Sequence, residues 1–569
     1  MKRSGARIII ECLREQGVDT VFGYPGGTIL NVYDELGKCR RKIRHILTCH
    51  EQGAAHAADG YARATGRVGV CFATSGPGAT NLTTGIATAY MDSSPVVFIT
   101  CNVSEPMIGK DSFQEVDITG ITMPITKNTY LVKDVKELAD VIREAFAIAA
   151  AGRPGPVLID VVKNVTQEKA EYTFLPKSEH ARHGSLALLQ GRSSLDETGW
   201  QPDGADIARL SRMIAASQRP LLICGGGVVL SRAGAELLEF ATRLDAPVAS
   251  TVMGGGGFPG RNPLSTGMIG MHGTQASNMA CDNCDLLIAV GCRFSDRVAL
   301  NPLSFARQAR IVQIDIDRAE IDKNVRTDHH IIGDAKQVLA LLNQHIGRYS
   351  HPEWKEHVFS FKTETVYDEG GDTLTPKQIS TVIAALAPAD TIVTTDVGQH
   401  QMWAIQHFRF DYPGQLITSG GFGAMGFGLG AAIGAKLGNP HKTVFHITGD
   451  GSFRMNCNEL ATAQYYGAPI ITFIYNNQSL GMVRQLQEVF CKGRHYAVDL
   501  RRGPDFVRLA QAYGLPGQRV TNSAQLEATL KKALKAKTGY VIDCAIDTEE
   551  LVRPMVSNGS HITQFLLDQ

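Results

Sequence analysis

The sequence has no excess of charge of either sign and no long apolar run. Its 56 Lys and Arg residues balance 56 Asp and Glu residues in a chain of 569. This balance gives no general electrostatic attraction for nucleic acid or for an acidic membrane surface. No apolar stretch reaches the roughly 18 residues that a membrane-spanning helix requires. We therefore expect no nucleic-acid partner and no membrane span.

The first residues lack the pattern of a targeting segment. Only Ile8, Ile9 and Ile10 form an apolar core before Glu11, which is too short for a secretory signal peptide. A long Ser- and Arg-rich extension, as in organelle import signals, is missing as well. The start instead predicts the first amphipathic helix of the fold, and we expect a cytoplasmic protein.

Cysteine is present but lacks the spacing of a metal site. Cys281 and Cys284 form the one pair with metal-type spacing, and no second pair accompanies it. Apolar stretches contain most of the other cysteines, among them Cys71, Cys101, Cys224 and Cys544. Reduced thiols that pack in the core are therefore the favoured interpretation.

Three stretches of the chain alternate apolar strands with helical segments. Such alternation predicts parallel sheets that are covered by helices on both faces. The predicted domains are 1–165, 206–346 and 373–550, and polar stretches at 166–205 and 344–372 separate them. The predicted fold class is therefore α/β, with three doubly wound parallel-sheet domains in series, of which the first and third look alike.

The expected strands are short apolar runs, many of them bounded by Gly or Pro. Their ranges are 18–23, 43–47, 68–73, 95–100 and 156–161, then 220–224, 247–251, 285–290 and 310–314, then 391–395, 415–418, 443–447, 469–475 and 540–545. Open α/β sheets bind ligands at the edge where their strands end. Residues that directly follow these strands are therefore the candidates for chemistry.

The most specific pattern joins two strand ends in the third domain. Gly449, Asp450 and Gly451 follow one strand, and Asn476 and Asn477 follow the next, with 27 positions between residues 450 and 477. Carboxylate and amide oxygens beside a diphosphate suit Mg²⁺, and glycines let backbone N–H groups approach phosphate. A Gly-Asp-Gly tripeptide alone could be merely a strand-to-helix turn. The full spacing resembles the thiamine-diphosphate-binding motif.

The resemblance to thiamine-diphosphate-dependent enzymes implies further cofactor contacts in the third domain. Asp450, Asn477 and Ser479 would bind Mg²⁺. The Gly423 carbonyl would accept the 4′-amino proton of the cofactor, and Met425 would wedge between its two rings. Core packing at a glycine-rich helix start is the alternative for Met425. The remaining implied contacts are Gln399, His400, Gly451, Ser452, Gly481 and Met482.

Glu51 is the candidate acid–base residue of the first domain. It lies between the strand at 43–47 and a helix rich in Gly and Ala, whose small residues suggest very close packing, as at a subunit interface. The carboxylate could simply cap this helix. The resemblance implies instead that Glu51 bonds N1′ of the cofactor and assists its proton transfers. Because Glu51 and the diphosphate motif lie in different domains, the family arrangement implies active sites at a homodimer interface.

Among these enzymes, the chain resembles the catalytic subunits of acetohydroxyacid synthases (acetolactate synthases) over essentially its whole length. The matching segments, in the family's order, are 24–27, 74–81, 111–115, 152–156, 270–273 and 480–485. By this resemblance Phe113, Gln114 and Lys163 line the entrance from the neighbouring subunit. It also implies a homodimer or homotetramer that could pair with a small regulatory subunit.

The central domain resembles the flavin-containing members of this family. Gly225, Gly226 and Gly227 follow its first strand, and alone they would be a weak sign of any nucleotide. Further loops at strand ends match the positions that hold FAD, namely Thr251, Met271, His272, Gly273, Arg293, Asp315, Ile316 and Asp334. The reaction of the family has no redox step, so the resemblance implies a structural role for the flavin.

The implied reaction is a carboligation in branched-chain amino acid biosynthesis. Pyruvate is decarboxylated on thiamine diphosphate, and its hydroxyethyl unit is transferred to pyruvate or 2-ketobutyrate, giving 2-acetolactate or 2-aceto-2-hydroxybutyrate. Arg297 is the candidate for the acceptor's carboxylate, because a guanidinium fork fits it bidentately; a structural ion pair is the alternative. Three other functions stay open: a flavin-dependent pyruvate oxidase, a fermentative flavin-free acetolactate synthase, and a catalytically silent homologue.

One residue departs from the family pattern and generates a prediction. After Gln485 the biosynthetic enzymes carry tryptophan, where this chain has Leu486. In the family that indole contacts the ethyl group of 2-ketobutyrate and forms a wall of the sulfonylurea channel. An extra methylene in an apolar pocket contributes only about 1–3 kcal/mol of discrimination. We therefore expect a weak preference for 2-ketobutyrate over pyruvate, poor sulfonylurea inhibition, and 2-acetolactate as the chief product.

A competition assay with both keto acids, run on the natural enzyme and on Leu486→Trp, measures this preference. The variant should gain selectivity for 2-ketobutyrate. A neighbour such as Met482 or Phe490 could instead fill the space of the missing indole. Strong selection for 2-ketobutyrate by the natural enzyme, unchanged in the variant, would show that residue 486 does not set acceptor choice.

Overall fold

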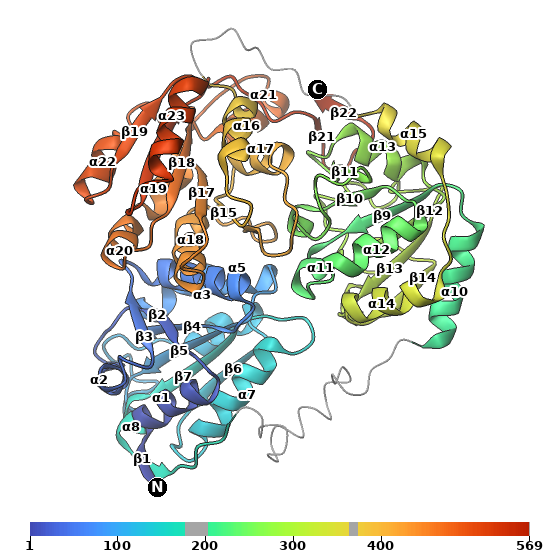
Figure 1. The fold of residues 1–569 in the computed structure, drawn as a ribbon. Coiled ribbons are helices and arrows are strands. Elements are labelled where there is room, and N and C mark those ends of the chain that lie inside the picture. Colours follow the sequence, from blue (N-terminus) through green and yellow to red (C-terminus); the bar gives the residue numbers. More distant parts are fainter. Residues whose placement is uncertain (177–202, 363–373, 568–569) are drawn as a thin grey trace.

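The computed structural model describes residues 1–176, 203–362 and 374–567. These residues form three six-stranded sheets and two two-stranded sheets. Every strand pair within the large sheets is parallel. Figure 1 shows each large sheet between helices, with the blue first domain, the green central domain and the orange third domain arranged around a common centre. The predicted α/β class with three doubly wound domains is confirmed.

The first domain has the strand order β3-β2-β4-β5-β7-β6. Its strands are β1 (Lys2–Ser4), β2 (Thr20–Gly23), β3 (Arg44–Leu47), β4 (Gly69–Thr74), β5 (Val96–Asn102), β6 (Asn128–Val132), β7 (Val157–Val162) and β8 (Lys169–Glu171). Its helices are α1 (Gly5–Glu15), α2 (Leu30–Lys38), α3 (Glu51–Thr65), α4 (Pro77–Thr80), α5 (Thr83–Met91), η1 (Glu105–Met107), α6 (Ile118–Thr122), η2 (Met123–Ile125), α7 (Leu138–Ala150) and α8 (Lys163–Gln167).

The central domain has the order β11-β10-β9-β12-β13-β14. Its strands are β9 (Pro220–Cys224), β10 (Val248–Ser250), β11 (Ser265–Met268), β12 (Leu286–Val290), β13 (Arg310–Asp315) and β14 (His329–Ile332). Its helices are α10 (Gly204–Ala216), α11 (Gly226–Leu230), α12 (Gly234–Leu244), η4 (Val252–Gly254), α13 (Gln275–Asn283), η5 (Arg318–Glu320), α14 (Ala335–His345) and α15 (Pro352–Ser360). Counted from β9, this is the 3-2-1-4-5-6 order of dinucleotide-binding sheets.

The third domain has the order β16-β15-β17-β18-β20-β19. Its strands are β15 (Ile392–Thr395), β16 (Leu416–Thr418), β17 (Val444–Gly449), β18 (Ile471–Asn476), β19 (Gly517–Val520) and β20 (Tyr540–Ala545). Its helices are α16 (Pro376–Leu386), α17 (Gln399–His407), α18 (Phe427–Gly438), α19 (Asp450–Asn456), α20 (Glu459–Tyr465), α21 (Gly481–Phe490), α22 (Phe506–Ala512) and α23 (Ser523–Ala533). Counted from its own first strand, each outer sheet reads 2-1-3-4-6-5, which confirms the expected likeness of the first and third domains.

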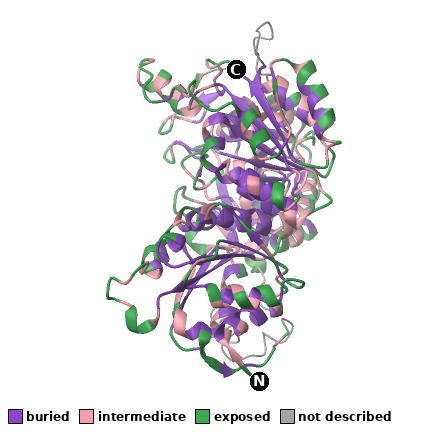
Figure 2. Ribbon diagram, turned by 90° about the vertical axis from the view of Figure 1, so that its left-hand side faces the viewer, coloured by how far each residue is buried: buried purple, intermediate pink, exposed green. Residues whose placement is uncertain are grey.

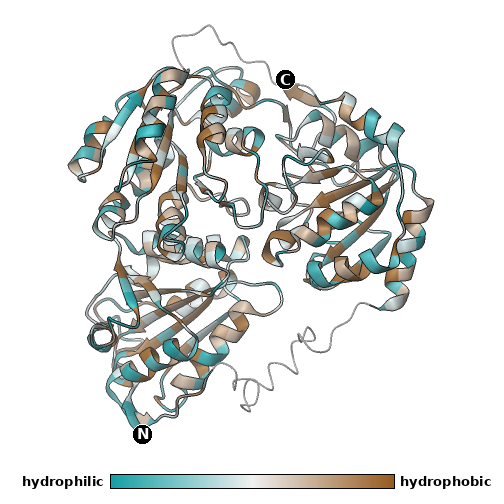
Figure 3. Ribbon diagram, in the orientation of Figure 1, coloured by the Kyte–Doolittle hydropathy of each residue, from teal (hydrophilic) through white to brown (hydrophobic). Residues whose placement is uncertain are grey.

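The central strands of each sheet are buried at every position because helices cover both faces. All residues of β4 and β5 are buried. Val70 packs with α1 and α7 on one face, whereas its neighbour Cys71 packs with α3 and α5 on the other. Figure 2 shows the buried strands inside each domain, and Figure 3 shows the same strands as hydrophobic while the outer helices are mixed. None of the helices that the described residues form is long and apolar enough to cross a membrane.

The strands that the apolar runs predict are all present, with ends shifted by at most two residues. In the six-stranded sheets, the strands that they do not predict are β6, β11, β14 and β19, and each lies at the edge of its sheet; the strands of the two small sheets are not predicted either. These edge strands have incomplete burial patterns. A strand with one open side needs no continuous apolar run, so its sequence carries a weaker signal.

The polar stretches expected between domains contribute structure of their own. Strand β8 pairs with β1 and so belongs to the first domain, while 177–202 of the first stretch lie outside the described residues. In the second stretch, α15 packs Trp354 into the core of the central domain, and the indole Nε1 donates to Pro220 O at 2.9 Å. One buried tryptophan therefore anchors a helix whose average composition is polar.

The last residues of the chain return to the central domain. Strands β21 (Met555–Val556) and β22 (Phe565–Leu567) pair with each other. Val556 and Ile562 are buried in the core of the central domain, and the N–H of Val556 donates to Met271 O at 2.8 Å. The central domain is therefore completed by residues beyond 550.

Most of the cysteines behave as reduced core residues, as expected, although Cys49 is exposed and Cys457 and Cys491 are half-buried. All 12 are unpaired, and Cys71, Cys101, Cys224 and Cys544 are buried. Cys281 and Cys284 are buried as well, and the Cys284 thiol donates to the Cys281 carbonyl at 3.2 Å. Burial raises the pKa of both thiols, which makes their thiolates unfavourable.

Helices α3 and α18 join the first domain to the third through backbone-to-backbone contact. A Cβ atom on Gly434 would lie 1.9 Å from the Ala57 carbonyl oxygen, and one on Gly60 would lie 2.2 Å from that of Ala431. The close packing expected of α3 is therefore present, but its partner is α18 of the same chain rather than another subunit. Figure 1 shows this crossing where the blue and orange domains meet.

This contact predicts opposite outcomes for two glycine substitutions. Gly434→Ala forces the helices apart, so we expect the free energy of unfolding to fall by about 1–3 kcal/mol. Gly37→Ala in α2 is the matched control, because a Cβ there meets no atom within 4 Å and alanine stabilises an open helix position by about 0.5–1 kcal/mol. Thermal unfolding followed by circular dichroism should show a lower midpoint for the first variant only. Equal midpoints would contradict the close approach of α3 and α18.

Candidate functional site

The predicted diphosphate and metal residues converge at one edge of the third sheet. From β15 the chain moves to one side to form β16 and then crosses to the other side to form β17 and β18. Gln399 and His400 begin α17 beyond β15, and Asp450 begins α19 directly after β17. Asn477 follows β18, whose Tyr475 pairs with Gly449. Such a switch point is where α/β sheets bind ligands.

The polar side chains at this switch point are buried. His400 is 5% exposed, and its Nε2 has no hydrogen-bond partner among the described residues. Burial lowers the pKa of His400 to about 4, so the imidazole is neutral at pH 7. Burial also raises the pKa of Asp450 to about 7, against the opposing effect of the Gly451 backbone N–H. The site therefore holds an unsatisfied polar atom and a carboxyl group that a cation would ionise.

Asn477 is held in place by an amide network. Its Nδ2 donates to Gln399 Oε1 at 3.0 Å, and its Oδ1 accepts from the Ser479 N–H at 3.2 Å. Gln399 in turn donates to Gln485 Oε1 at 2.9 Å. A Cβ on Gly481 would lie 1.9 Å from Gln399 Oε1, so a larger residue there would displace the Gln399 amide from this network. The Asn477 oxygen keeps a second lone pair for a ligand.

The loop between β16 and α18 lies over the Gly449–Gly451 turn. Gly423 is exposed in this loop and has the left-handed backbone angle φ = 74°. Met425 is half-buried, and its Cε lies 3.9 Å from a Cβ built on Gly451. Met425 therefore lies beside the Gly449–Gly451 turn, while its contact with the cofactor stays a prediction. On the other side of the turn, Ser452 Oγ donates to Val397 O at 3.2 Å.

Glu51 begins α3 at the carboxyl edge of the first sheet, but it does not cap the helix. His50 is the cap, because its Nδ1 accepts from the Gln52 N–H at 3.1 Å. Glu51 is 9% exposed, and its Oε2 accepts from Asn81 Nδ2 at 2.9 Å. The helix-cap interpretation of Glu51 is therefore not supported, and its carboxylate points toward the loop after β4.

The backbone before Glu51 is held by the third domain. The fully buried Glu459 of α20 accepts from the N–H groups of Cys49 at 3.2 Å and His50 at 3.1 Å. Thr462 Oγ1 also donates to it, at 2.6 Å. A Cβ on Gly53 would lie 2.2 Å from Glu459 Oε1. The position of Glu51 therefore depends on a carboxylate that is distant in sequence.

Gln114 and Lys163 lie at the same edge as Glu51, beyond β5 and β7. Gln114 has φ = 59°, and its Cα would lie 2.8 Å from a Cβ on Gly76, which follows β4. Phe113 beside it is 86% exposed. Lys163 begins α8 and is half-buried. The structure thus brings these residues to one edge, while their place at a subunit entrance stays a prediction.

A cleft of about 3360 Å³ lies among the three domains and contains the strand ends of the central sheet. The predicted flavin contacts that line it are Gly226, Gly227, Thr251, Met271, His272, Arg293, Asp315, Ile316 and Asp334. Two predicted contacts, Gly225 and Gly273, lie outside the lining residues. Gly225 is packed against Gly291, whose carbonyl oxygen would lie 2.1 Å from a Cβ at this position.

Charged groups that line the cleft come from all three domains, with Asp411 and Lys442 from the third. Burial raises the pKa of Asp315, at the end of β13, to about 6. Asp334 caps α14 by accepting from the Lys336 and Gln337 N–H groups. Arg153 reaches the cleft from the first domain, and its Nη1 lies 2.6 Å from Glu320 Oε1. Arg153 was not among the predicted contacts, because it lies in the turn at 152–156 before β7 and does not follow a strand.

Arg297 and Leu486 also line the cleft. The Arg297 side chain is 61% exposed, and its Nη1 lies 3.6 Å from Asp296 Oδ2, which is equally exposed. An exposed pair of this kind contributes little to stability. A purely structural ion pair is therefore a weak explanation for Arg297, whose guanidinium is open to the cleft.

Comparisons with known proteins match the whole chain. The family models of the thiamine pyrophosphate enzymes match as an N-terminal TPP binding domain at 3–121, a central domain at 207–342 and a C-terminal TPP binding domain at 396–544. The chain is 44% identical to the probable acetolactate synthase large subunit of Methanocaldococcus jannaschii, over 99% of this chain and 95% of the relative. It is 43% identical to the acetolactate synthase isozyme 2 large subunit of Escherichia coli K12, over 99% of both. The chain belongs to the acetolactate synthase large subunits.

The switch point of the third sheet fits thiamine pyrophosphate with a cation. His400 Nε2 needs a partner, and the Gly449–Gly451 turn leaves backbone N–H groups for phosphate oxygens. Among the described residues no three His, Cys, Asp or Glu side chains cluster as a metal site. A cation here could be held by Asp450, by the Asn477 oxygen and by the diphosphate itself, which suits a hard ion with few protein ligands.

Proposed function

We propose that the protein decarboxylates pyruvate and transfers the hydroxyethyl unit to a second 2-keto acid, forming 2-acetolactate or 2-aceto-2-hydroxybutyrate. The observation that carries the proposal is the site at the third sheet, where Asp450 and Asn477 lie at the same strand ends as a buried His400 whose Nε2 has no partner among the described residues. The names of the relatives, acetolactate synthase large subunits, support this reaction.

Thiamine diphosphate and Mg²⁺ are the proposed cofactors at this site. Asp450 and Asn477 would hold Mg²⁺, and His400 would donate to a diphosphate oxygen from Nε2 in the tautomer that carries the proton there. Met425 and Gly423 would contact the rings of the cofactor from the loop above the turn. When bound, thiamine diphosphate supplies the carbon nucleophile and accepts the electrons that decarboxylation releases.

Glu51 is proposed to exchange a proton with N1′ of the aminopyrimidine. Asn81 orients its carboxylate through the bond at 2.9 Å, and Glu459 fixes the backbone before it. Among the described residues, Glu51 makes no hydrogen bond or ion pair with Asp450 or Asn477. Following the arrangement in the family, Glu51 is proposed to serve the Asp450 site of a second copy.

Exposed apolar side chains support a homodimer or homotetramer of this kind. At the carboxyl edge of the first sheet, Tyr24 is 40% exposed, Leu47 44% and Phe113 86%. Large apolar groups gathered at one edge are typical of protein interfaces. The second copy would cover them and would place Gln114 and Lys163 beside its Asp450 site. Because the relatives are named large subunits, a small regulatory subunit is a further proposed partner.

FAD is the proposed occupant of the cleft in the central domain. The β9–α11 turn with Gly226 and Gly227 lies at the switch point between β9 and β12, as in sheets that bind dinucleotides. Asp315 ends β13 and Asp334 follows β14. Both carboxylates could accept hydrogen bonds from hydroxyl groups of the cofactor. Arg297, open to the same cleft, would bind the carboxylate of pyruvate or 2-ketobutyrate as acceptor. The flavin takes no part in this carboligation, so its proposed role is structural.

Product analysis with each cofactor omitted in turn tests the proposal. Purified protein with pyruvate, thiamine diphosphate, Mg²⁺ and FAD should form 2-acetolactate, and omission of thiamine diphosphate or Mg²⁺ should abolish it. Oxygen uptake measured in the same samples should stay at background. Oxygen uptake without acetolactate would instead identify a pyruvate oxidase.

Removing the charge of Glu51 should slow turnover while the fold is kept. We expect Glu51→Gln to lower kcat by about 10²–10⁴-fold, which is the usual contribution of acid–base catalysis, with cofactor affinity changed by less than about tenfold. Glu11→Gln is the control, since Glu11 is also buried but pairs with Arg7 and Arg14 in α1. Near-normal turnover of Glu51→Gln would remove Glu51 from the mechanism.

Mg²⁺ affinity should depend on pH through Asp450. Burial holds the pKa of this carboxyl at about 7 in the metal-free protein, so below pH 7 the ion must displace a proton. We expect affinity to fall by about tenfold per pH unit below 7 and to level off above pH 8. Asp450→Asn keeps an oxygen ligand but does not titrate, so its affinity should be weaker and independent of pH, whereas Asp450→Ala should need higher Mg²⁺ and thiamine diphosphate for activity. Calorimetric titration between pH 6 and 8.5 measures this, and parallel curves for wild type and Asp450→Asn would place the metal elsewhere.

A further inference from the structure

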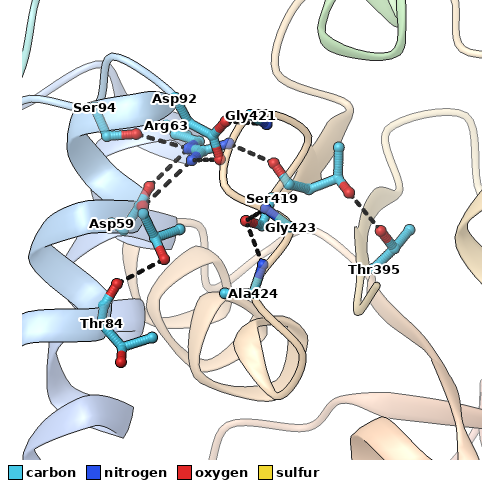
Figure 4. Close-up of polar contacts among 12 residues, drawn as sticks. Asp59, Arg63, Thr84, Asp92, Ser94, Thr395, Ser419, Gly421, Gly423 and Ala424 are labelled. Atoms are coloured by element: carbon cyan, nitrogen blue, oxygen red, sulfur yellow. Dashed lines mark hydrogen bonds and ion pairs between the residues drawn. The ribbon is translucent and has the colours of Figure 1, made fainter. Parts of the chain in front are cut away.

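A buried cluster of charged side chains in the first domain, Asp59, Arg63 and Asp92, holds the loop between β16 and α18. Figure 4 shows Arg63, near the end of α3, between Asp59 and Asp92, with the loop from Ser419 to Ala424 beside them. Asp92 directly follows α5. The loop carries Gly423 and leads to Met425, the residues proposed to contact the rings of thiamine diphosphate.

Arg63 and Asp92 each bond the third domain directly. Arg63 Nη1 donates to Thr418 O at 2.7 Å, and the Gly421 N–H donates to Asp92 Oδ1 at 2.6 Å. The two side chains are joined to each other, since Arg63 Nη2 lies 3.0 Å from Asp92 Oδ2. Asp59 holds the guanidinium from the other side, with Oδ1 at 2.6 Å from Nε. One ion pair therefore bonds both the end of β16 and the loop that follows it.

The cluster is buried and carries more negative than positive charge. The side chains of Asp59 and Asp92 are fully buried, and that of Arg63 is 10% exposed. Two carboxylates thus share one guanidinium, and burial raises the pKa of Asp92 although Arg63 opposes this. A buried carboxylate needs hydrogen-bond donors. The Gly421 N–H is one of them, so the charge of the cluster binds the loop backbone.

The bonded part of the loop has little freedom. A Cβ on Gly421 would lie 2.6 Å from Asp92 Oδ1 and 2.8 Å from Met91 O. Ser419 Oγ accepts from the N–H groups of Gly423 at 3.1 Å and Ala424 at 3.0 Å. A shift at Gly421 therefore moves the backbone that presents Gly423 and Met425.

We propose that Asp92 and Arg63 are positioning residues for thiamine diphosphate, which hold the Gly421–Met425 loop from the first domain in the shape that the cofactor needs. They do not touch the reacting atoms, and they act through the backbone of Gly421 and Thr418. The inference rests on the proposed function, because that function assigns the loop to the cofactor. It adds that the first domain of the same chain shapes the cofactor site of the third domain.

Two substitutions at Asp92 test the proposal. Asp92→Ala removes the acceptor for Gly421 and the partner of Arg63. Asp92→Asn is nearly isosteric but offers only one acceptor oxygen, so it keeps one of the two contacts. We expect the Kd for thiamine diphosphate at saturating Mg²⁺ to rise about tenfold or more in Asp92→Ala, as removal of a buried charged partner implies, and by less in Asp92→Asn.

Hydrogen exchange of the cofactor-free protein gives a readout that does not depend on activity. Amides in the segment 419–425 should exchange faster in both Asp92 variants, while those of α19 should be unchanged. Glu15→Gln is the matched control, because Glu15 also binds a buried arginine, with Oε1 at 2.9 Å from Arg143 Nη2, and lies away from the loop. It should lower the unfolding midpoint but leave the Kd for thiamine diphosphate and exchange at 419–425 unchanged.

The outcomes separate this proposal from the proposed function. Failure of the wild-type protein to bind thiamine diphosphate would overturn the function itself. Binding by the wild type, with unchanged affinity and unchanged exchange at 419–425 in Asp92→Asn and Asp92→Ala, would overturn only the positioning role. If Asp92→Ala does not fold, faster exchange and weaker binding in Asp92→Asn still support the role, and their absence there rejects it.

Discussion

The direct contact between the backbones of α3 and α18 is the constraint on which the arrangement of the outer domains depends. It exists because Gly60 and Gly434 have no side chain to separate the helices. Helix α3 carries Glu51 at its first position and Arg63 in its last turn. The crossing therefore fixes both ends of one helix against the third domain, where Glu459 holds the first end and the Thr418 carbonyl holds the second. Candidate catalytic and positioning groups thus share one rigid support.

The candidate site residues lie at the carboxyl edges of the sheets. Their polar side chains differ in whether they already have a hydrogen-bond partner. Glu51 and Asn477 already have side-chain partners that orient them. Among the residues that the structure describes, the buried Nε2 of His400 has no such partner, and burial raises the pKa of the Asp450 carboxyl to about 7. A hydrogen bond that orients a side chain prepares it for its role. A buried polar group without a partner raises the free energy of the site and favours a ligand that pairs with it.

Local patterns in the sequence were sufficient for the interior strands and for the groups at their ends, such as Asp450 and Asn477, because apolar runs and spacing are local properties. Edge strands such as β6 were not predicted, because a strand with one open side needs no continuous apolar run. The contacts of Glu459 with His50 and of Asp92 with Gly421 could not be predicted, since they join residues that lie 409 and 329 positions apart. Such pairs are decided by how domains pack, and the composition of either segment carries no sign of the other.

The return of the chain end to the central domain has a consequence for biosynthesis. Val556 and Ile562 belong to the same core as Leu287 and Ala289 of β12, although the whole third domain is translated between them. The central domain therefore emerges early from the ribosome with an apolar face that its own residues cannot cover. That face stays open until residues 556–562 have been made, so the central domain can complete its core only after the third domain has left the ribosome.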